Sequence, residues 1–215
     1  NNWLDKEMEL ITGGANDDYA KANKVYDYVQ HTVKNIGRGG IYLKKPVKEV
    51  FKSNTGYSQE INLLLTTMLR HEKLEAYPVI LSTTSNGHTS EIYPLISKFN
   101  YVVCKVTLNG IDYYLDASQP YLGFGKLPGN AYNGHSRVVS KEMSPVYFSA
   151  DTLKESKVTS IFLSNDLKKP GGWTGSSNHI YGYMESSDIR QFILEKGKSE
   201  LEKSLKDAFT DLYSI

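Results

Sequence analysis

Residues 56–70 of the chain read GYSQEINLLLTTMLR. The glycine at position 56 suits a sharp turn, and the apolar side chains that follow recur at the spacing of an α-helix. The main apolar stripe consists of Ile61, Leu64, Leu65 and Met68, and Leu63 and Leu69 widen it. This pattern predicts a helix that is buried on more than one side. Enzymes use such an arrangement to hold a nucleophile at a helix N-terminus, and Ser58 occupies that position.

Two further helices are expected before this segment. Apolar residues recur at helical spacing between positions 22 and 33, with the acidic residues Asp17 and Asp18 near the expected N-terminus. A short helical turn is expected after Pro46, because proline is favoured in the first turn of a helix. The part of the chain before residue 72 is therefore expected to be mainly helical.

After His71 the apolar period changes from 3.6 to 2, which indicates β-strands. Asn109-Gly110 separates two strand candidates and is a strong signal for a β-hairpin. The expected strands cover residues 76–81, 99–108, 111–115, 137–139, 146–148, 158–163 and 179–184. A turn is expected at residues 168–172, and a last helix from Ser187 to about Leu212. Helices followed by an antiparallel sheet predict an α+β fold.

The composition of the 215 residues is that of a globular protein, with 40% hydrophobic and 23% charged residues. A net charge of +1 gives no reason to expect nucleic acid as a partner, and no apolar run is long enough for membrane insertion. The single cysteine, Cys104, excludes an internal disulfide, and the five histidines show no ligand spacing, so no metal or cofactor is expected. Because the first residue is Asn1 and not Met, we expect a piece of a longer protein.

Several separated segments resemble the core of bacterial transglutaminase-like domains, which belong to the papain-like cysteine protease superfamily. The resemblance is carried by residues 52–65, 68–70, 75–79, 99–103 and 114–117. It implies a transglutaminase-like core over residues 1–145, with N-terminal helices packed on an antiparallel sheet. Residues 146–215 are then a C-terminal extension of strands and a helix. Large exported bacterial proteins carry similar segments beside flanking domains of unknown function, which implies a periplasmic or cell-envelope location.

The resemblance also implies where a catalytic triad would stand. In the family, cysteine opens the central helix, histidine begins the next strand and aspartate ends the strand after it. These positions correspond to Ser58, Tyr101 and Asp116, so only the aspartate is retained. A phenol has an unperturbed pKa of about 10 and is a poor base at neutral pH, and a nearby carboxylate raises that pKa further. We therefore expect a pseudoenzyme in which these positions are vestigial.

The first functional hypothesis is a binding or scaffolding module within a larger exported bacterial protein. Its ligand would be a peptide or a glycan lying in the former substrate groove, and the flanking domains of the same chain would be further partners. The groove is expected to be walled by Tyr57, Ser58, Asn86, Tyr101 and Tyr121, because aromatic faces supply contact area.

Two other hypotheses remain open. The chain could be a weak hydrolase or acyltransferase that uses Ser58 with a histidine recruited from a loop, such as His88 or His135. Alternatively, the domain is a spacer whose cleft is filled, and Ser58 is then the N-cap of its helix. Cys104 lies inside an alternating strand and is expected to be a core residue.

Overall fold

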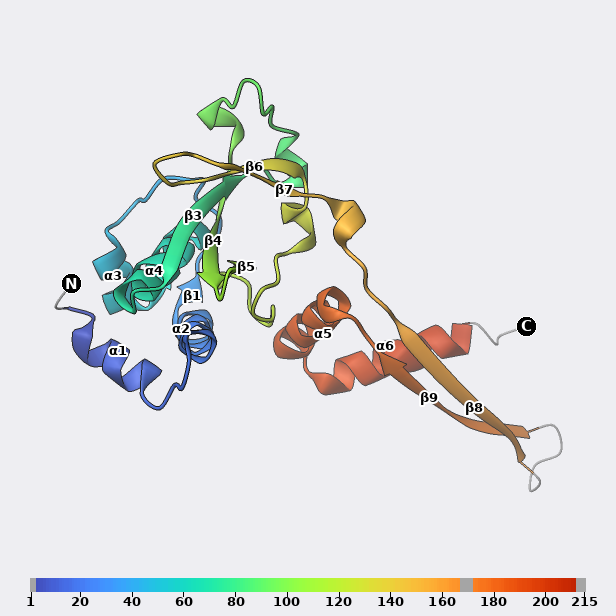
Figure 1. The fold of residues 1–215 in the computed structure, drawn as a ribbon. Coiled ribbons are helices and arrows are strands. Elements are labelled where there is room, and N and C mark those ends of the chain that lie inside the picture. Colours follow the sequence, from blue (N-terminus) through green and yellow to red (C-terminus); the bar gives the residue numbers. More distant parts are fainter. Residues whose placement is uncertain (1–2, 167–171, 212–215) are drawn as a thin grey trace. The chain divides into compact units, whose positions relative to one another are not determined.

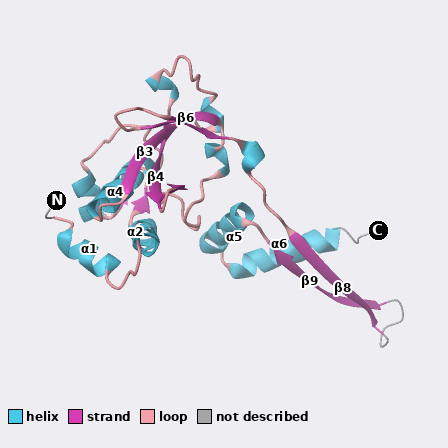
Figure 2. Ribbon diagram, viewed as in Figure 1, coloured by secondary structure: helices cyan, strands magenta, loops and turns pink. Residues whose placement is uncertain are grey.

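The computed structural model describes residues 3–166 and 172–211. The chain divides into two compact units, Asn1–Leu153 and Lys154–Ile215 (Figure 1). Each unit combines helices with antiparallel strands that occupy separate stretches of the chain, which confirms the α+β fold (Figure 2). Within the described residues, no helix combines the length and the apolar character needed to cross a membrane.

The N-terminal unit begins with four helices. They are α1 (Asp5–Thr12), α2 (Asp18–Thr32), α3 (Val47–Ser53) and α4 (Ser58–His71). Helices α2, α3 and α4 form where the sequence predicted them, whereas α1 was not expected. The Asp17 side chain caps α2 by accepting a hydrogen bond of 2.7 Å from the backbone N–H of Ala20, as acidic residues at this position commonly do.

Helix α4 is the centre of the main hydrophobic core. The side chains of its predicted apolar stripe are fully buried, and they pack with residues of α1, α2 and strand β4 (Tyr101–Leu108). Cys104 lies in this core, where burial raises the pKa of its thiol to about 12. A thiol in this environment is unreactive, so the expected core role of Cys104 agrees with the structure.

The main sheet has five antiparallel strands in the order β5-β4-β3-β6-β7. Besides β4, they are β3 (Glu75–Leu81), β5 (Ile111–Leu115), β6 (Gly134–Val138) and β7 (Pro145–Phe148). Asn109 and Gly110 both adopt positive φ between β4 and β5, which confirms the predicted hairpin. A small parallel pair joins β1 (Lys34–Asn35) to β2 (Thr55–Gly56).

The two faces of the main sheet carry different residues of the same strands. Val102 and Cys104 of β4 lie on the face that α4 covers, whereas Tyr101 and Val103 belong to a second core on the opposite face. Leu127 and Phe148 are also part of this second core. Strand β7 thus belongs to the main sheet. The domain boundary expected after residue 145 falls inside this strand, and the compact N-terminal unit extends to Leu153.

The C-terminal unit contains a hairpin and two helices. These are β8 (Val158–Asp166), β9 (Gly172–Ile180), α5 (Tyr183–Lys196) and α6 (Lys198–Asp211). The prediction of a strand over residues 179–184 was wrong beyond Ile180, because α5 begins at Tyr183. The single predicted last helix is two helices, which Gly197 separates with a φ of +89°. Most of the expected turn at residues 168–172, and Leu212, lie outside the described residues.

Candidate functional site

Tyr101 and Asp116, two of the three triad positions, are in direct contact. Tyr101 is the first residue of β4, and Asp116 directly follows β5. The Tyr101 hydroxyl donates a hydrogen bond of 2.7 Å to Asp116 Oδ2, and both side chains are fully buried. Burial, followed by the Asp116 carboxylate, raises the pKa of Tyr101 well above its usual range. The phenol therefore stays protonated at neutral pH.

The second carboxylate oxygen of Asp116, Oδ1, also accepts hydrogen bonds. Oδ1 accepts hydrogen bonds from Asn62 Nδ2 at 2.8 Å, from the backbone N–H of Ser118 at 3.0 Å and from Ser118 Oγ at 2.6 Å. Asn62 lies on α4, one turn after Ser58, and its Oδ1 accepts from the backbone N–H of Ala117 at 2.9 Å. Asp116 thus joins the central helix to the loop after β5. Sequence reasoning missed Asn62 and Ser118.

Tyr101 makes two further polar contacts that complete this network. Its hydroxyl accepts a hydrogen bond from Gln119 Nε2 at 3.0 Å and lies 3.1 Å from Ser118 Oγ. We call Asn62, Tyr101, Asp116, Ser118 and Gln119 the Asp116 network. A buried carboxylate is stable when its oxygens are hydrogen-bonded in this way, and such a network holds its members in one arrangement.

Ser58, the third triad position, is the first residue of α4 and is buried. Tyr57 occupies the N-cap position, so the expectation that Ser58 caps the helix was wrong. The backbone N–H of Ser58 donates to the carbonyl of Gly37 at 2.9 Å. In the part of the chain that the structure describes, Ser58 Oγ has no hydrogen-bond partner. The described side chains therefore include no base within hydrogen-bonding distance of Ser58 Oγ.

A segment of residues 36–46, which we call the strap, is held at the N-terminus of α4 by two buried side chains. Gln59 accepts from the backbone N–H of Gly39 at 3.0 Å and donates to the carbonyl of Tyr42 at 3.1 Å. Glu60 Oε1 accepts from the backbone N–H groups of Lys44 and Lys45, both at 3.0 Å. Its Oε2 accepts from the backbone N–H of Tyr57 at 2.9 Å. These bonds fix the strap against the helix.

The strap also supplies cations to two aromatic rings of the site. The guanidinium of Arg38 lies 5.5 Å from the centre of the Tyr101 ring, and Lys44 Nζ lies 3.9 Å from the centre of the Tyr57 ring. An added Cβ at Gly39 would lie 2.3 Å from Gln59 Nε2, so a larger residue there would displace the Gln59 side chain that holds the strap. The strap therefore contacts both Tyr101 and the turn that precedes Ser58, and both triad positions are closed to solvent.

The remaining residues of the expected groove, Tyr57, Asn86 and Tyr121, are not members of the Asp116 network. Asn86 is exposed, and its side chain donates within its own region to Ser82 Oγ at 3.0 Å and to the carbonyl of Lys98 at 2.9 Å. Tyr57 and Tyr121 are half-buried. The structure thus brings Tyr101 and Asp116 together, but it leaves no exposed surface on Ser58 or Tyr101 for a ligand.

The histidines that could serve as a base are engaged elsewhere. His71 contacts Asp5 Oδ1 at 2.7 Å, and His88 contacts the carbonyl of Asn133 at 3.3 Å. His135 Nδ1 lies 2.9 Å from Thr89 Oγ1, and burial lowers the pKa of its imidazole. Within the described residues, no group of three or more His, Cys, Asp or Glu side chains is arranged to hold a metal ion.

Comparison with known proteins agrees with this architecture. Residues 7–110 match the model of the transglutaminase-like superfamily. The chain is similar to the crystal structure of a candidate protease from Parabacteroides distasonis, with a TM-score of 0.52 and 18% identity over 67% of this chain and 27% of that one. A candidate cysteine protease from Cytophaga hutchinsonii gives a TM-score of 0.44 and 15% identity, over 84% of this chain and 51% of that one.

The chain therefore spans between about a quarter and a half of the length of these proteins. No curated protein matches it significantly in sequence. The family match falls on the helices and strands that position Ser58 and Tyr101. The N-terminal unit therefore contains a segment, residues 7–110, that matches the transglutaminase-like superfamily, and its α+β fold is consistent with that match.

Proposed function

We propose that this domain is catalytically inactive and acts as a binding or scaffolding module of a longer, exported bacterial protein. The observation that carries the proposal is the hydrogen bond between the Tyr101 hydroxyl and Asp116 Oδ2. In a triad, an imidazole at this position would accept a proton from the nucleophile while the carboxylate orients it. Here the phenol instead donates a hydrogen bond to the carboxylate and keeps its proton, so the base is missing.

The state of Ser58 supports the same proposal. A serine hydroxyl becomes a useful nucleophile only when a neighbouring base removes its proton. Among the described residues Ser58 Oγ has no partner at all, and its side chain is closed to solvent. Loss of the nucleophile or the base alone costs on the order of a millionfold in a serine protease triad. Both are changed in this chain.

The closed site favours a scaffolding role for the triad positions over direct ligand contact. The Asp116 network links α4, β4 and the loop after β5, and its members are buried or nearly so. A peptide or glycan in the former groove would contact Ser58 or Tyr101 only after movement of the strap. We therefore propose that ligands and flanking domains bind to other surfaces of the domain.

An activity assay tests this proposal directly. We would measure hydrolysis of p-nitrophenyl acetate and incorporation of a fluorescent amine into casein, with the wild-type chain and with Ser58→Ala. Both proteins are expected to give the uncatalysed rate in both assays. Turnover that disappears in Ser58→Ala and follows a histidine-like pKa would instead establish the alternative, a Ser58-dependent hydrolase or acyltransferase.

A second experiment asks whether the replaced residues alone account for inactivity. The double variant Ser58→Cys, Tyr101→His would be prepared in a Cys104→Ala background, so that one thiol is present. Because Ser58 is buried under the strap, we expect this thiol to react with iodoacetamide at pH 6 more slowly than free cysteine. Faster reaction would reveal a thiolate–imidazole pair and would mean that a catalytic geometry survives.

A further inference from the structure

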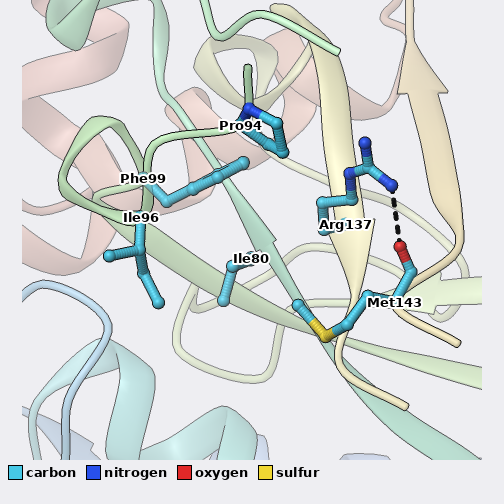
Figure 3. A pocket seen from close by; sticks show the side chains of 6 residues that line it. All are labelled: Ile80, Pro94, Ile96, Phe99, Arg137 and Met143. Carbon is cyan, nitrogen blue, oxygen red and sulfur yellow. Dashed lines mark hydrogen bonds between the residues drawn. The ribbon is translucent and has the colours of Figure 1, made fainter. Parts of the chain in front are cut away.

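A second feature of the N-terminal unit is a cavity that lies apart from the Asp116 network. It encloses about 260 Å³ and is lined by Ile80, Pro94, Ile96, Phe99, Arg137 and Met143. Figure 3 shows Pro94, Ile96 and Phe99 on one side, Arg137 and Met143 on the other, and Ile80 between them. The lining is thus apolar except for Arg137.

The position of the cavity follows from the strand register. Ile80 of β3 pairs with Val102 of β4 and with Arg137 of β6, so these three side chains share one face of the sheet. Val102 packs with Ile80 and Phe99, and Leu63 of α4 lies against the same cluster. The cavity is therefore on the sheet face that carries α4, above the neighbouring strands β3 and β6.

Arg137 brings a positive charge that forms no salt bridge among the described residues. Its Nη1 donates to the carbonyl of Met143 at 2.9 Å, and its Nη2 donates to the carbonyl of Glu91 at 3.0 Å. The carboxylate of Glu91 instead accepts a hydrogen bond from the Tyr147 hydroxyl. Among the described residues Arg137 forms no ion pair, and its Nε is buried without a partner. An uncompensated guanidinium beside an apolar cavity is complementary to a ligand that is apolar and anionic.

Apolar surface continues beyond the cavity along the segment that forms its rim. Ile92, Tyr93 and Leu95 are 79%, 76% and 60% exposed, respectively. Large apolar side chains that are exposed together, and not singly, commonly mark an interaction surface. A cavity of about 260 Å³ lies just below the roughly 300 Å³ at which sites for drug-sized ligands begin, so it has room for a large apolar side chain. The occupant therefore has one group inside the cavity and further contacts on the rim.

From these observations we propose that the cavity binds the C-terminal residue of a peptide with an apolar last side chain. The apolar side chain fills the space between Ile80, Ile96 and Phe99. The terminal carboxylate pairs with the guanidinium of Arg137, and the preceding residues lie over the exposed rim. This site lies outside the triad positions, so its existence does not depend on whether Ser58 is active.

Binding of matched tripeptides to the full chain tests the inference. The probes are N-acetyl-Ala-Ala-Leu with a free carboxylate and the same peptide as a carboxamide, measured by isothermal titration calorimetry. We expect the acid to bind with a dissociation constant below about 1 mM and the amide to bind about tenfold or more weakly. Failure of both to bind, or equal binding of the two, would overturn the proposal.

Two pairs of variants locate the site. Ile96→Trp fills the cavity and should abolish binding of the acid, whereas Ile111→Trp makes the same change at an exposed position of β5, outside the cavity and its rim, and should preserve it. Arg137→Gln should reduce the ratio of acid to amide affinity to about one, whereas Arg137→Lys, which keeps the charge, should retain part of it. If Arg137→Gln does not fold, the two tryptophan variants still show whether the peptide binds in the cavity. Unchanged binding in Ile96→Trp would place the ligand elsewhere.

Free 4-methylpentanoate separates a peptide from a small acid, because it carries the same side chain and carboxylate without the preceding residues. We expect it to bind more weakly than the tripeptide acid, since it does not reach the exposed rim. Equal affinity would overturn the peptide assignment and identify a site for small monocarboxylic acids. The assays on Ser58 test the proposed inactivity, and these titrations test the peptide site. A negative result in one does not affect the other.

Discussion

The Asp116 network and the cavity beside Arg137 lie close together in the sequence but differ in almost every physical property. Tyr101 and Phe99 are two residues apart, and one belongs to each region. The network is polar and closed, and the hydrogen-bonding groups that face Asp116 are paired. The cavity is apolar and open at a rim of exposed side chains, and its charged residue, Arg137, forms no salt bridge within the described part of the chain.

This difference separates the residues that hold the fold from those available to a ligand. In a closed polar network, each group depends on the others, because an unpaired buried group is costly. At an open apolar rim, side chains already contact water and can be changed at little cost. Substitutions in the Asp116 network should therefore lower the free energy of unfolding much more than substitutions at the cavity. Four experiments test this difference.

The largest effect is expected for Asp116→Ala. The change removes the acceptor for Asn62, Tyr101 and the two donors of Ser118, and it leaves buried donors unpaired. We expect the free energy of unfolding to fall by about 3 kcal/mol or more, measured by urea denaturation. Asp112→Ala is the control: this exposed residue of β5 is paired with Lys105, and its loss should cost less than about 1 kcal/mol. Equal losses would contradict a special role for the network.

A smaller loss is expected for Tyr101→Phe, which deletes one hydroxyl group and keeps the ring. Asp116 Oδ2 then loses its donor, and Gln119 loses an acceptor. We expect the free energy of unfolding to fall by about 1 to 2 kcal/mol at pH 7. Tyr93→Phe removes the same atom from an exposed ring and should change it by less than about 0.5 kcal/mol. A neutral Tyr101→Phe would show that the hydroxyl is dispensable.

The ionisation of Tyr101 predicts a loss of stability in alkaline solution. The pKa of this phenol is raised in the folded state, first by burial and then by Asp116, so above about pH 10 the unfolded chain releases a proton that the folded chain keeps. The free energy of unfolding should thus decrease as the pH rises, with a contribution from Tyr101 of up to about 1.4 kcal/mol per pH unit.

Tyr101→Phe should make this alkaline dependence shallower by that amount. Tyr26, whose pKa is also raised by burial, is unchanged in the variant and accounts for part of the remaining slope. Urea denaturation of both proteins between about pH 9 and 11 measures the difference. Parallel curves for the two proteins would mean that Tyr101 ionises in the folded state as readily as in the unfolded one.

The smallest effect is expected at the rim of the cavity. Ile96 is 54% exposed, and Ile96→Ala should change the free energy of unfolding by less than about 0.5 kcal/mol. Ile61→Ala makes the same truncation at a fully buried position of α4 and should cost about 2 to 5 kcal/mol. A large loss in Ile96→Ala would show that the rim stabilises the fold and is not a free surface.

Much of the N-terminal unit could be predicted from the sequence because its signals are local. The apolar stripe of α4 and the Asn109-Gly110 turn each specify an element within a few residues. The direct contact between Tyr101 and Asp116 agrees with the positions implied by the family resemblance. In the C-terminal unit, a local signal was overlooked: Gly197 divides the predicted last helix, because it ends α5 with a left-handed backbone.

The rest of the site depends on contacts between segments that are distant in the sequence. The strap has no periodic pattern, and its position is fixed only through Gln59 and Glu60. The partners of Asp116 come from a helix and from a loop, so their meeting could not be predicted from spacing. One hint was present: Asn62 is a polar residue in a helix that was expected to be buried on more than one side. The cavity likewise requires residues 94–99 to fold over β3.

The geometry around Tyr101 has an evolutionary consequence. The side chains of Gln119, Ser118 and Asp116 are arranged around an oxygen atom that lies at the far end of a phenol ring. Histidine is shorter and carries no atom at that point, so a mutation to histidine would deprive Asp116 Oδ2 and Gln119 Nε2 of this partner. In a protein that has lost catalysis, as we propose here, stability therefore opposes the change of Tyr101 to histidine and so preserves the tyrosine without any catalytic role for it.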